Sequence, residues 1–501
     1  MRHASSFLRS EKARMLSAPI LPRALNEECG VFGIIGHDGP AAPIVALGLH
    51  ALQHRGQEAA GITTYHDGQF HSDKQLGLVA DHFNAEEVLA KLHGTSGIGH
   101  TRYSTTGESS LRNVQPLYAD LDRGGIAIAH NGNLTNARNL RQELISKGSI
   151  FHTTSDSELF VQLTALSRGL TMSDKVIDAA RAVEGAFALT VLTRDALIGV
   201  RDPVGIRPLV LGKLGDAHVL ASESCAFDLI GAEFIRDVEP GEVIVCGRDG
   251  SLVSRRISAE AKNPRPCIFE LIYFARPNSF VDGESVYDIR KRLGRTLAEE
   301  SPVEADIISP IPDSGVPSAI GFAQASNVDY EMALIRSHYS GRTFIQPDQK
   351  VREMGVARKH SANAGVVRGK RVVLVDDSLV RGTTSRKIIK MIRDAGAKEV
   401  HLRVACPPIT HPDFYGIDTP SKDELLASNN TVEEMRQQIG ADSLAFLSLD
   451  GLYKALGKGP RDGDAPAFTD HCFTGDYPTS LIDQDKTESR IEQLSFLREA
   501  R

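Results

Sequence analysis

The sequence predicts two domains in tandem: a mixed α+β domain on a β scaffold, then an α/β domain with a doubly wound parallel sheet. In the first half, apolar strand-like runs are separated by polar, glycine-rich insertions, which is typical of functional loops on a β scaffold. In the second half, short apolar runs alternate with stretches of helical periodicity, as in the strand–helix units of a parallel sheet. A chain of 501 residues has room for two or three domains.

The composition is that of a globular protein, with 41% hydrophobic and 24% charged residues. A net charge of −7 gives no reason to expect a nucleic acid or a membrane surface as partner. No apolar run reaches the length of a membrane span. The six cysteines show no C-x-x-C spacing, which favours a reducing compartment. We therefore expect a cytoplasmic protein.

Residues 1–28 form a leader with five basic side chains and three acids. A propeptide, an organelle transit peptide, a disordered tail and a true start at Met15 are all consistent with it.

The first domain begins at Cys29, which opens the apolar run CGVFGIIG. Four polar segments follow it: QHRGQEAAGI (53–62), GIGHTRYSTTG (97–107), HNGNL (130–134) and TSDSE (154–158). Three of these features have an ordinary structural explanation, whereas Arg102, among small polar residues without an obvious acidic neighbour, is the hardest to explain in that way. Cys29 could be a buried thiol, HNGNL a tight turn and Asp156 a helix N-cap.

Taken together with ECGVFGI, these segments resemble, in the same order, the glutaminase domain of class II glutamine amidotransferases. The resemblance covers residues 29–260 and implies the four-layer αββα fold of N-terminal nucleophile hydrolases. It also implies that Cys29 is the nucleophile after removal of residues 1–28. The freed α-amino group could then act as its base.

The same resemblance implies roles for five further residues. Asn131 and the backbone N–H of Gly132 would stabilise the oxyanion. Arg102 would bind the α-carboxylate of glutamine and Asp156 its α-ammonium group, while Arg55 would support the pocket wall.

Two segments later in this domain, RDPVGIRPL (201–209) and ASES (221–224), are interpreted as structural loops near the domain junction. Residues 254–266 are polar and contain two prolines, which makes them the best candidate for a linker.

The second domain opens at Cys267 with a predicted strand and loop that lead to a helix starting near Ser285. A second strand–turn–helix unit spans residues 306–323, with Ser314 at its turn. The arginine- and lysine-rich segment 337–360 is interpreted as a lid over a polyanion.

The most informative stretch runs from Arg371 to Ala395. An apolar strand at 372–375 leads to Asp376 and Asp377, a turn containing Gly382, and a predicted helix. Backbone N–H groups, hydroxyls and a helix N-terminus suit a phosphate, and the carboxylates suit a hard cation or sugar hydroxyls. A solvated turn with a capping residue would look similar, and a Walker loop is excluded because GK[ST] is missing.

VVLVDDSLVRGTTS also resembles the signature of type I phosphoribosyltransferases, which implies phosphoribosyl diphosphate (PRPP) as ligand. The implied PRPP-binding residues are Asp376, Asp377, Ser378, Arg381, Gly382, Thr383, Thr384, Ser385, Arg342 and Lys359. One Mg²⁺ per subunit, bound with PRPP, would be held by Ser314, Asp376 and Asp377.

The order of the two halves resembles the amidophosphoribosyltransferase family over residues 29 to about 480. It implies that ammonia from glutamine attacks C1 of PRPP, giving 5-phosphoribosylamine, glutamate and diphosphate, the first committed step of purine synthesis. The expected division is a leader (1–28), a glutaminase domain (29–260), a phosphoribosyltransferase domain (267–455) and a C-terminal tail (456–501). Purine nucleotides are expected as feedback inhibitors, and a dimer or tetramer as the oligomer.

One branch of this family binds a [4Fe-4S] cluster through four cysteines. Cys267 and Cys472 match two of those positions, while Asp413 and Thr469 stand at the others, so we expect no cluster. An unusual ligand set that includes Cys406 is the alternative.

Other functions are less well supported. An asparagine synthetase needs an S-G-G-x-D-S loop and a glucosamine-phosphate synthase needs sugar-isomerase domains, and neither is found. The remaining alternative is a catalytically inactive homologue that senses PRPP or nucleotides. A DNA-binding regulator would need an added basic motif.

Overall fold

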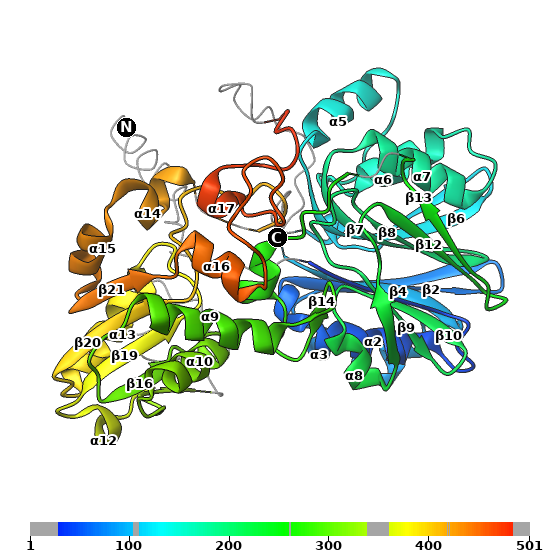
Figure 1. The fold of residues 1–501 in the computed structure, drawn as a ribbon. Coiled ribbons are helices and arrows are strands. Elements are labelled where there is room, and N and C mark those ends of the chain that lie inside the picture. The colour runs from blue at the N-terminus through cyan, green and yellow to red at the C-terminus, as the bar shows by residue number, and fades with distance from the viewer. Residues whose placement is uncertain are drawn as a thin grey trace, which may run out of the picture.

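The computed structural model describes residues 29–103, 110–259, 262–337, 360–417, 419 and 421–483. Two bodies lie side by side, the blue-to-green N-terminal half and the green-to-orange C-terminal half (Figure 1). The predicted leader (1–28) and nearly all of the predicted lid lie outside the described residues. Among the helices described, none is both long and apolar enough to cross a bilayer.

The first half contains two antiparallel sheets. In the described residues, one sheet has the strand order β11-β9-β10-β1-β4-β2-β3 and the other β13-β12-β8-β7-β6-β5. The strands of the first are β1 Gly30–Ile35, β2 Ala59–His66, β3 Gln69–Leu76, β4 Ser96–Arg102, β9 Val210–Leu214, β10 Ala217–Ala221 and β11 Glu233–Asp237. Those of the second are β5 Leu117–Leu121, β6 Gly124–Leu134, β7 Gly185–Thr193, β8 Ala196–Arg201, β12 Glu242–Gly247 and β13 Leu252–Arg256.

Side chains alternate between the two faces of each strand, and this alternation explains the four layers. In β1, Phe32 and Ile34 pack against α2 (Ala41–Ala51) and α8 (Cys225–Ile230). Val31 and Ile35, on the other face, pack against the second sheet. The outer face of that sheet packs against α6 (Glu158–Leu166) and α7 (Met172–Ala182). Since successive strand residues point to opposite faces, both sheets bury both faces, and the predicted αββα arrangement is confirmed.

The second half contains a parallel sheet. Its strands are β16 Ile307–Pro310, β19 Arg371–Asp376, β20 Glu399–Val404 and β21 Ser443–Phe446, in that order. Tyr330 adds a parallel bridge on the free side of β16. The strand segment that follows β16 in sequence, at Tyr330, therefore lies on one side of β16, while the strands that follow β19 lie on the opposite side of the sheet. Right-handed crossovers then place helices on opposite faces, as in the predicted doubly wound fold.

The main helices of this half are α9 Val286–Glu300, α10 Val316–Ser326, α13 Thr383–Asp394, α15 Val432–Ile439 and α16 Leu449–Ala455. The point between β16 and β19 is the topological switch point, where ligands bind in open α/β sheets. The loops that carry Ser314 and Asp377 follow these two strands directly.

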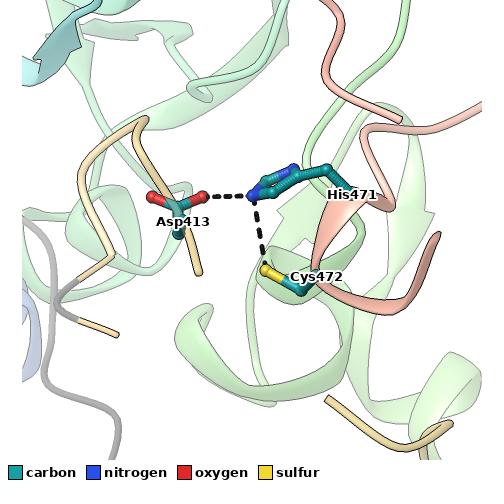
Figure 2. Close-up of side chains that lie close together, drawn as sticks. All are labelled: Asp413, His471 and Cys472. Carbon is teal, nitrogen blue, oxygen red and sulfur yellow. Dashed lines mark hydrogen bonds and ion pairs between the residues drawn. The ribbon is translucent and has the colours of Figure 1, made fainter. Parts of the chain in front are cut away.

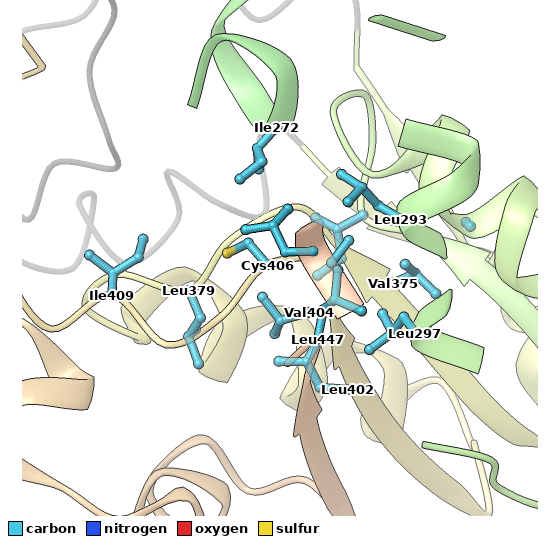
Figure 3. Packing of buried hydrophobic residues seen from close by; sticks show 14 of the residues in the cluster. Ile272, Leu293, Leu297, Val375, Leu379, Leu402, Val404, Cys406, Ile409 and Leu447 are labelled. Carbon is cyan, nitrogen blue, oxygen red and sulfur yellow. The ribbon is translucent and has the colours of Figure 1, made fainter. Parts of the chain in front are cut away.

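The core of the second half is continuous, as Figure 3 shows, with Val375, Leu402 and Val404 on the strands meeting Leu293 and Leu297 of α9. The apolar run at 372–375 is fully buried, as predicted for a strand covered on both faces.

The shorter described elements complete the fold. They are α3 Val79–His82, α4 Glu86–Leu89, α5 Ala137–Ser146, β14 Phe280–Val281, β15 Glu284–Ser285, β17 Leu334–Arg336, β18 His360–Ala362, α12 Ala364–Val367, α14 Leu426–Asn429 and α17 His471–Thr474, with 3₁₀ turns η1 Gln53–Arg55, η2 Leu111–Asn113 and η4 Lys422–Glu424.

Two expectations at the junction were wrong. The strand predicted after Cys267 is a π-helix, η3 (Glu270–Phe274), because a short apolar run does not distinguish a strand from a buried helical turn. The predicted linker begins inside β13, since Arg256 pairs with Glu242 of β12.

The helix predicted near Ser285 is α9, and the Ser285 side chain caps it by accepting a hydrogen bond from the N–H of Asp288.

The segment 201–209 is a junction loop, as predicted, and Asp202 organises it. The buried Asp202 carboxylate accepts hydrogen bonds from the N–H groups of Val204 (3.1 Å), Gly205 (2.7 Å) and Ile206 (3.0 Å) through Oδ1, and from Arg207 N–H (3.1 Å) through Oδ2. One carboxylate thereby satisfies most of the loop's backbone donors.

Asp202→Ala should lower the free energy of unfolding by about 3 kcal/mol, because it leaves several buried N–H groups without an acceptor. Denaturant unfolding followed by circular dichroism measures this. Asp195→Ala, at a side chain that is 79% exposed, is the matched control and should change stability by less than about 0.5 kcal/mol. Equal effects of the two substitutions would contradict this role of Asp202.

Candidate active sites

Strand alternation brings the predicted glutaminase residues to the space between the two sheets. Val31 and Ile98 face the inter-sheet core, so Cys29, two residues before Val31, and Arg102, four after Ile98, project to the same side. Gly30 pairs with Thr101, which sets Cys29 beside Arg102. On β6, Ala127 and Ala129 face this core. Asn131, two residues further along the strand, therefore faces it as well.

The predicted oxyanion donors lie on an open strand edge. Leu117, the first residue of β5, pairs with Ile128, so beyond Ile128 β6 has no strand neighbour on that side. The N–H of His130 is bound there by Gln115 Oε1 at 2.7 Å, and the N–H of Leu134 by Asp156 Oδ2 at 3.0 Å. Since backbone donors alternate along a strand, the N–H of Gly132 lies between them on the same edge.

The Asn131 side chain is fully buried, and among the described residues neither of its amide atoms has a hydrogen-bond partner. Buried polar groups are usually satisfied, so an unpaired amide next to a free strand edge is suited to a ligand. Residues 130–134 are strand rather than the tight turn considered above. Gly132 has φ +135, and a Cβ there would lie 2.1 Å from the carbonyl oxygen of Ala186.

Asp156 is not a helix N-cap. Its Oδ2 atom binds the backbone of β6, and Ser157 occupies the N-cap position of α6. The carboxylate lines a cavity of about 190 Å³ with Asn133 and Arg141, closed on one side by Phe414 and Asp483 of the C-terminal half.

The Cys29 thiol is poorly ionised where it stands. Burial raises the pKa of Cys29 to about 11, although the nearby Arg102 guanidinium opposes the shift. Its Sγ donates a hydrogen bond to the carbonyl of Tyr103 at 3.4 Å. The thiolate is the reactive form, so this thiol needs a base at neutral pH.

Arg55 stands apart from the other predicted glutamine-site residues. Its guanidinium is 1% exposed and pairs with Glu223 and with Glu270 of η3. Arg207 also contacts Glu270, at 3.4 Å. The connection of Arg55 to the site is indirect. The next residue, Gly56, packs against Arg102 so closely that a Cβ on Gly56 would lie 2.7 Å from the Arg102 backbone.

The predicted metal residues meet at the switch point of the parallel sheet. Burial raises the pKa of Asp376 well above its usual range, and the adjacent Asp377 charge raises it further. Burial also raises the pKa of Asp377, while hydrogen bonds from Ser314 and Ser378 and the charge of Arg290 oppose that shift. The buried Asp377 carboxylate, the half-buried Asp376 carboxylate and the Ser314 hydroxyl form an oxygen donor set that fits Mg²⁺.

The turn after the carboxylates has the geometry expected for a phosphate. Gly382 adopts φ 72 at the N-cap of α13, a left-handed conformation suited to glycine, and Thr383, Thr384 and Ser385 form the first helical turn. Arg381 is turned toward Glu424, at 2.9 Å. The predicted PRPP contacts Arg342 and Lys359 lie outside the described residues.

The positions of the four-cysteine cluster carry a different set of groups. Cys267 and Cys472 are buried thiols, but Asp413 pairs with His471 and the Thr469 hydroxyl donates to the carbonyl of Arg265. Two thiols with a carboxylate and an engaged hydroxyl do not fit a cluster held by four thiolates.

The sequence reasoning missed some residues that the structure makes important. Arg290 lies in an ordinary basic helix pattern, yet it is buried within electrostatic range of Asp377, and burial lowers its pKa to about 10. Arg207 and Glu223 lie in the two segments predicted to be junction loops, and they join the two halves through contacts that include Glu270 of η3. Nothing in the sequence marked Glu270 itself.

Comparison with known proteins agrees with this architecture. Residues 100–228 match a glutamine amidotransferase domain and residues 280–419 a phosphoribosyl transferase domain. Amidophosphoribosyltransferase of Rhizobium etli is 56% identical over 483 residues, 96% of this chain and 97% of that protein. The chloroplastic enzyme of Vigna aconitifolia is 51% identical, over 92% and 94% of the two chains.

A solved structure, glutamine phosphoribosylpyrophosphate amidotransferase from Bacillus subtilis complexed with ADP and GMP, has the same fold. Its TM-score is 0.85 at 49% identity, and the match covers 90% of this chain and 98% of that one.

Fold, sites and comparisons define a glutamine-dependent transferase in which a class II glutaminase precedes a type I phosphoribosyltransferase. The chain belongs to the amidophosphoribosyltransferase family. It acts in purine synthesis, using glutamine and PRPP to form 5-phosphoribosylamine, and no finding favours the inactive nucleotide-sensing alternative.

Proposed function

We propose that Cys29 attacks the carboxamide of glutamine and that its own α-amino group, freed by removal of residues 1–28, accepts the thiol proton. An amine with a pKa of about 8 can serve as base at neutral pH. The attack gives a tetrahedral oxyanion. Ammonia then leaves, and water hydrolyses the thioester to glutamate.

The observation that carries this assignment is the open edge of β6. The unpaired Asn131 amide and the N–H of Gly132 are the two donors for the oxyanion. Arg102 binds the α-carboxylate and Asp156 the α-ammonium group, because they bring opposite charges to the same space as Cys29. Arg55 supports this wall from its buried position behind Gly56.

In the second domain, the 381–385 turn holds the 5′-phosphate of PRPP, with Arg342 and Lys359 as further contacts. Asp376, Asp377 and Ser378 lie at the ribose. Mg²⁺, held by Ser314, Asp376 and Asp377, would stabilise the negative charge that develops on the diphosphate leaving group. Two adjacent carboxylates with raised pKa values, Asp377 buried and Asp376 half-buried, support a bound cation.

The wider setting follows from the family. The chain comprises a leader (1–28), a glutaminase domain (29–260), a phosphoribosyltransferase domain (267–455) and a C-terminal tail (456–501). The enzyme is a cytoplasmic dimer or tetramer. Purine nucleotides inhibit by occupying the PRPP site. The Bacillus subtilis relative solved in complex with ADP and GMP supports the binding of purine nucleotides by proteins of this kind. Unchanged activity with millimolar AMP and GMP would contradict the inhibition.

Intact mass spectrometry tests the first step. The purified active protein should begin at Cys29, because only then does the nucleophile carry its own amine. A fully active species that retains residues before Cys29 would refute the proposed base.

Asn131→Ala should lower kcat for glutamine hydrolysis about 10²–10³-fold, with a much smaller change in KM, because the oxyanion exists only after attack. Steady-state release of glutamate measures both constants. Asn131→Asp, which keeps the shape but replaces the donor with an anion, should be at least as damaging. A full-rate Asn131→Asp enzyme would exclude Asn131 as an oxyanion donor.

Asp376→Asn should reduce ammonia-dependent synthesis about 100-fold or more and raise the Mg²⁺ concentration needed for half-maximal rate, since a metal-bound oxyanion is worth several kcal/mol. Rates are measured over a Mg²⁺ titration and after chelation with EDTA. Asp394→Asn, at the exposed far end of α13, is the control and should behave as wild type. A Mg²⁺ dependence that Asp376→Asn leaves unchanged would place the metal elsewhere.

A further inference from the structure

Asp413, His471 and Cys472 form a buried group between the loop after β20 and helix α17, as Figure 2 shows. His471 Nε2 lies 2.8 Å from Asp413 Oδ2 and 3.3 Å from Cys472 Sγ. All three residues are nearly inaccessible to solvent. A buried carboxylate is costly unless it is paired or hydrogen-bonded, so the contact with His471 is part of what keeps Asp413 in place.

The second carboxylate oxygen of Asp413 shapes the following loop, residues 413–417. Its Oδ1 accepts hydrogen bonds from the N–H groups of Tyr415, at 2.7 Å, and Ile417, at 2.8 Å. The N–H of Asp413 itself donates to Thr419 Oγ1 at 2.6 Å. The 413–417 loop is therefore wrapped around one carboxylate, and His471 ties that carboxylate to α17.

The outer side of the same loop rests on the glutaminase domain. Asn133 Nδ2 donates to the carbonyl of Phe414 at 2.9 Å, and Arg207 Nε donates to the carbonyl of Tyr415 at 3.1 Å. Gly416, with φ +125, lies next to Gly132: a Cβ on Gly416 would be in van der Waals contact with the Gly132 backbone, at 3.4 Å.

These contacts fall on the part of β6 that carries the oxyanion donors. Asn133 is the residue after Gly132, and Asn133, Asp156 and Phe414 line the same cavity. The second domain thus contributes part of the lining of a cavity next to this end of β6. A shift of this loop would move the Gly132 edge, and displacements of about 1 Å at a reacting centre can cost a factor near 100 in rate.

We propose that Asp413 and His471 are positioning residues for the glutamine half-reaction. Their contact holds the 413–417 loop of the phosphoribosyltransferase domain against the oxyanion edge of β6. Asp413 stands at one of the positions where a branch of the family has a cluster cysteine, and His471 directly precedes Cys472, which matches another. In this chain a carboxylate–imidazole contact joins the 413–417 loop to α17. The proposal rests on the proposed role of Asn131 and Gly132.

The test compares two nitrogen sources in one enzyme. Asp413→Asn keeps an Oδ1 acceptor for Tyr415 and Ile417 but replaces the oxygen that faces His471. His471→Gln removes the imidazole from the other side. Phosphoribosylamine formation is measured with glutamine and with ammonium chloride, and glutamate release is measured alongside.

Both variants should lower kcat with glutamine about tenfold or more while ammonium-dependent synthesis stays within about twofold of wild type. The double variant should be no worse than the more damaging single variant, because both changes break one contact. If Asp413→Asn does not fold, His471→Gln carries the same comparison.

Cys472→Ala is the matched control, because it removes the third member of the group and leaves the Asp413–His471 contact. It should keep the wild-type ratio of glutamine- to ammonium-dependent rates. An equal loss in Cys472→Ala would mean that the three side chains act together through a shared ligand, and the proposal would be wrong. Equal losses with both nitrogen sources, or no loss with either, would also overturn it.

Cys29→Ser separates this proposal from the proposed function. If Cys29→Ser retained glutamine-dependent synthesis, the glutaminase assignment itself would fail. If Cys29→Ser abolished it while Asp413→Asn and His471→Gln kept the wild-type ratio, the positioning role alone would be refuted.

Discussion

A buried group of charges joins the two halves of the molecule, and the placement of both sites depends on it. Arg55 on the glutaminase side pairs with Glu223 and with Glu270, the first residue of η3 in the other half. Burial alone would raise the pKa of Glu223, but the charges of Arg55 and His54 outweigh it and hold that pKa well below its usual range. Removing one partner of such a pair typically costs about 3–5 kcal/mol, so the domains have little freedom to separate without breaking it.

The two sites differ in the groups that they present: hydrogen-bond donors without a charge in the first domain, and carboxylates in the second. The glutaminase site offers uncharged donors on a strand edge and an amide without a partner, which suits charge that exists only in the transition state. The phosphoribosyltransferase site holds two adjacent carboxylates, one buried and one half-buried, whose charged forms are disfavoured, which suits a bound cation. Free ammonia is largely protonated in neutral water, so a reaction that passes it from one site to the other benefits when neither domain can drift away.

Comparison of sequence and structure separates local from long-range information. The strand at 372–375 and the helix α13 were predictable because their apolar spacing is complete within a few residues. Asn131 and Gly132 were assigned by resemblance, but their setting on an uncovered strand edge depends on where β5 begins. The segment after Cys267 was misjudged because a short, mostly apolar run can be a strand or a helical turn.

By itself, the sequence determined the two fold types and their order, and it pointed to a phosphate site at 372–385, since these depend on residue type and short-range spacing. The nucleophile and oxyanion residues were proposed from the resemblance of short motifs to a known family. Only the tertiary structure decided which charges are buried together. Arg55 and Glu270 are 215 residues apart, and Asn133 meets Phe414 across 281. No local pattern encodes such pairs, because they arise from the way two folded domains pack. Long-range packing therefore decided the partners of Arg55, the position of the 413–417 loop beside Gly132, and the contact between Asp413 and His471.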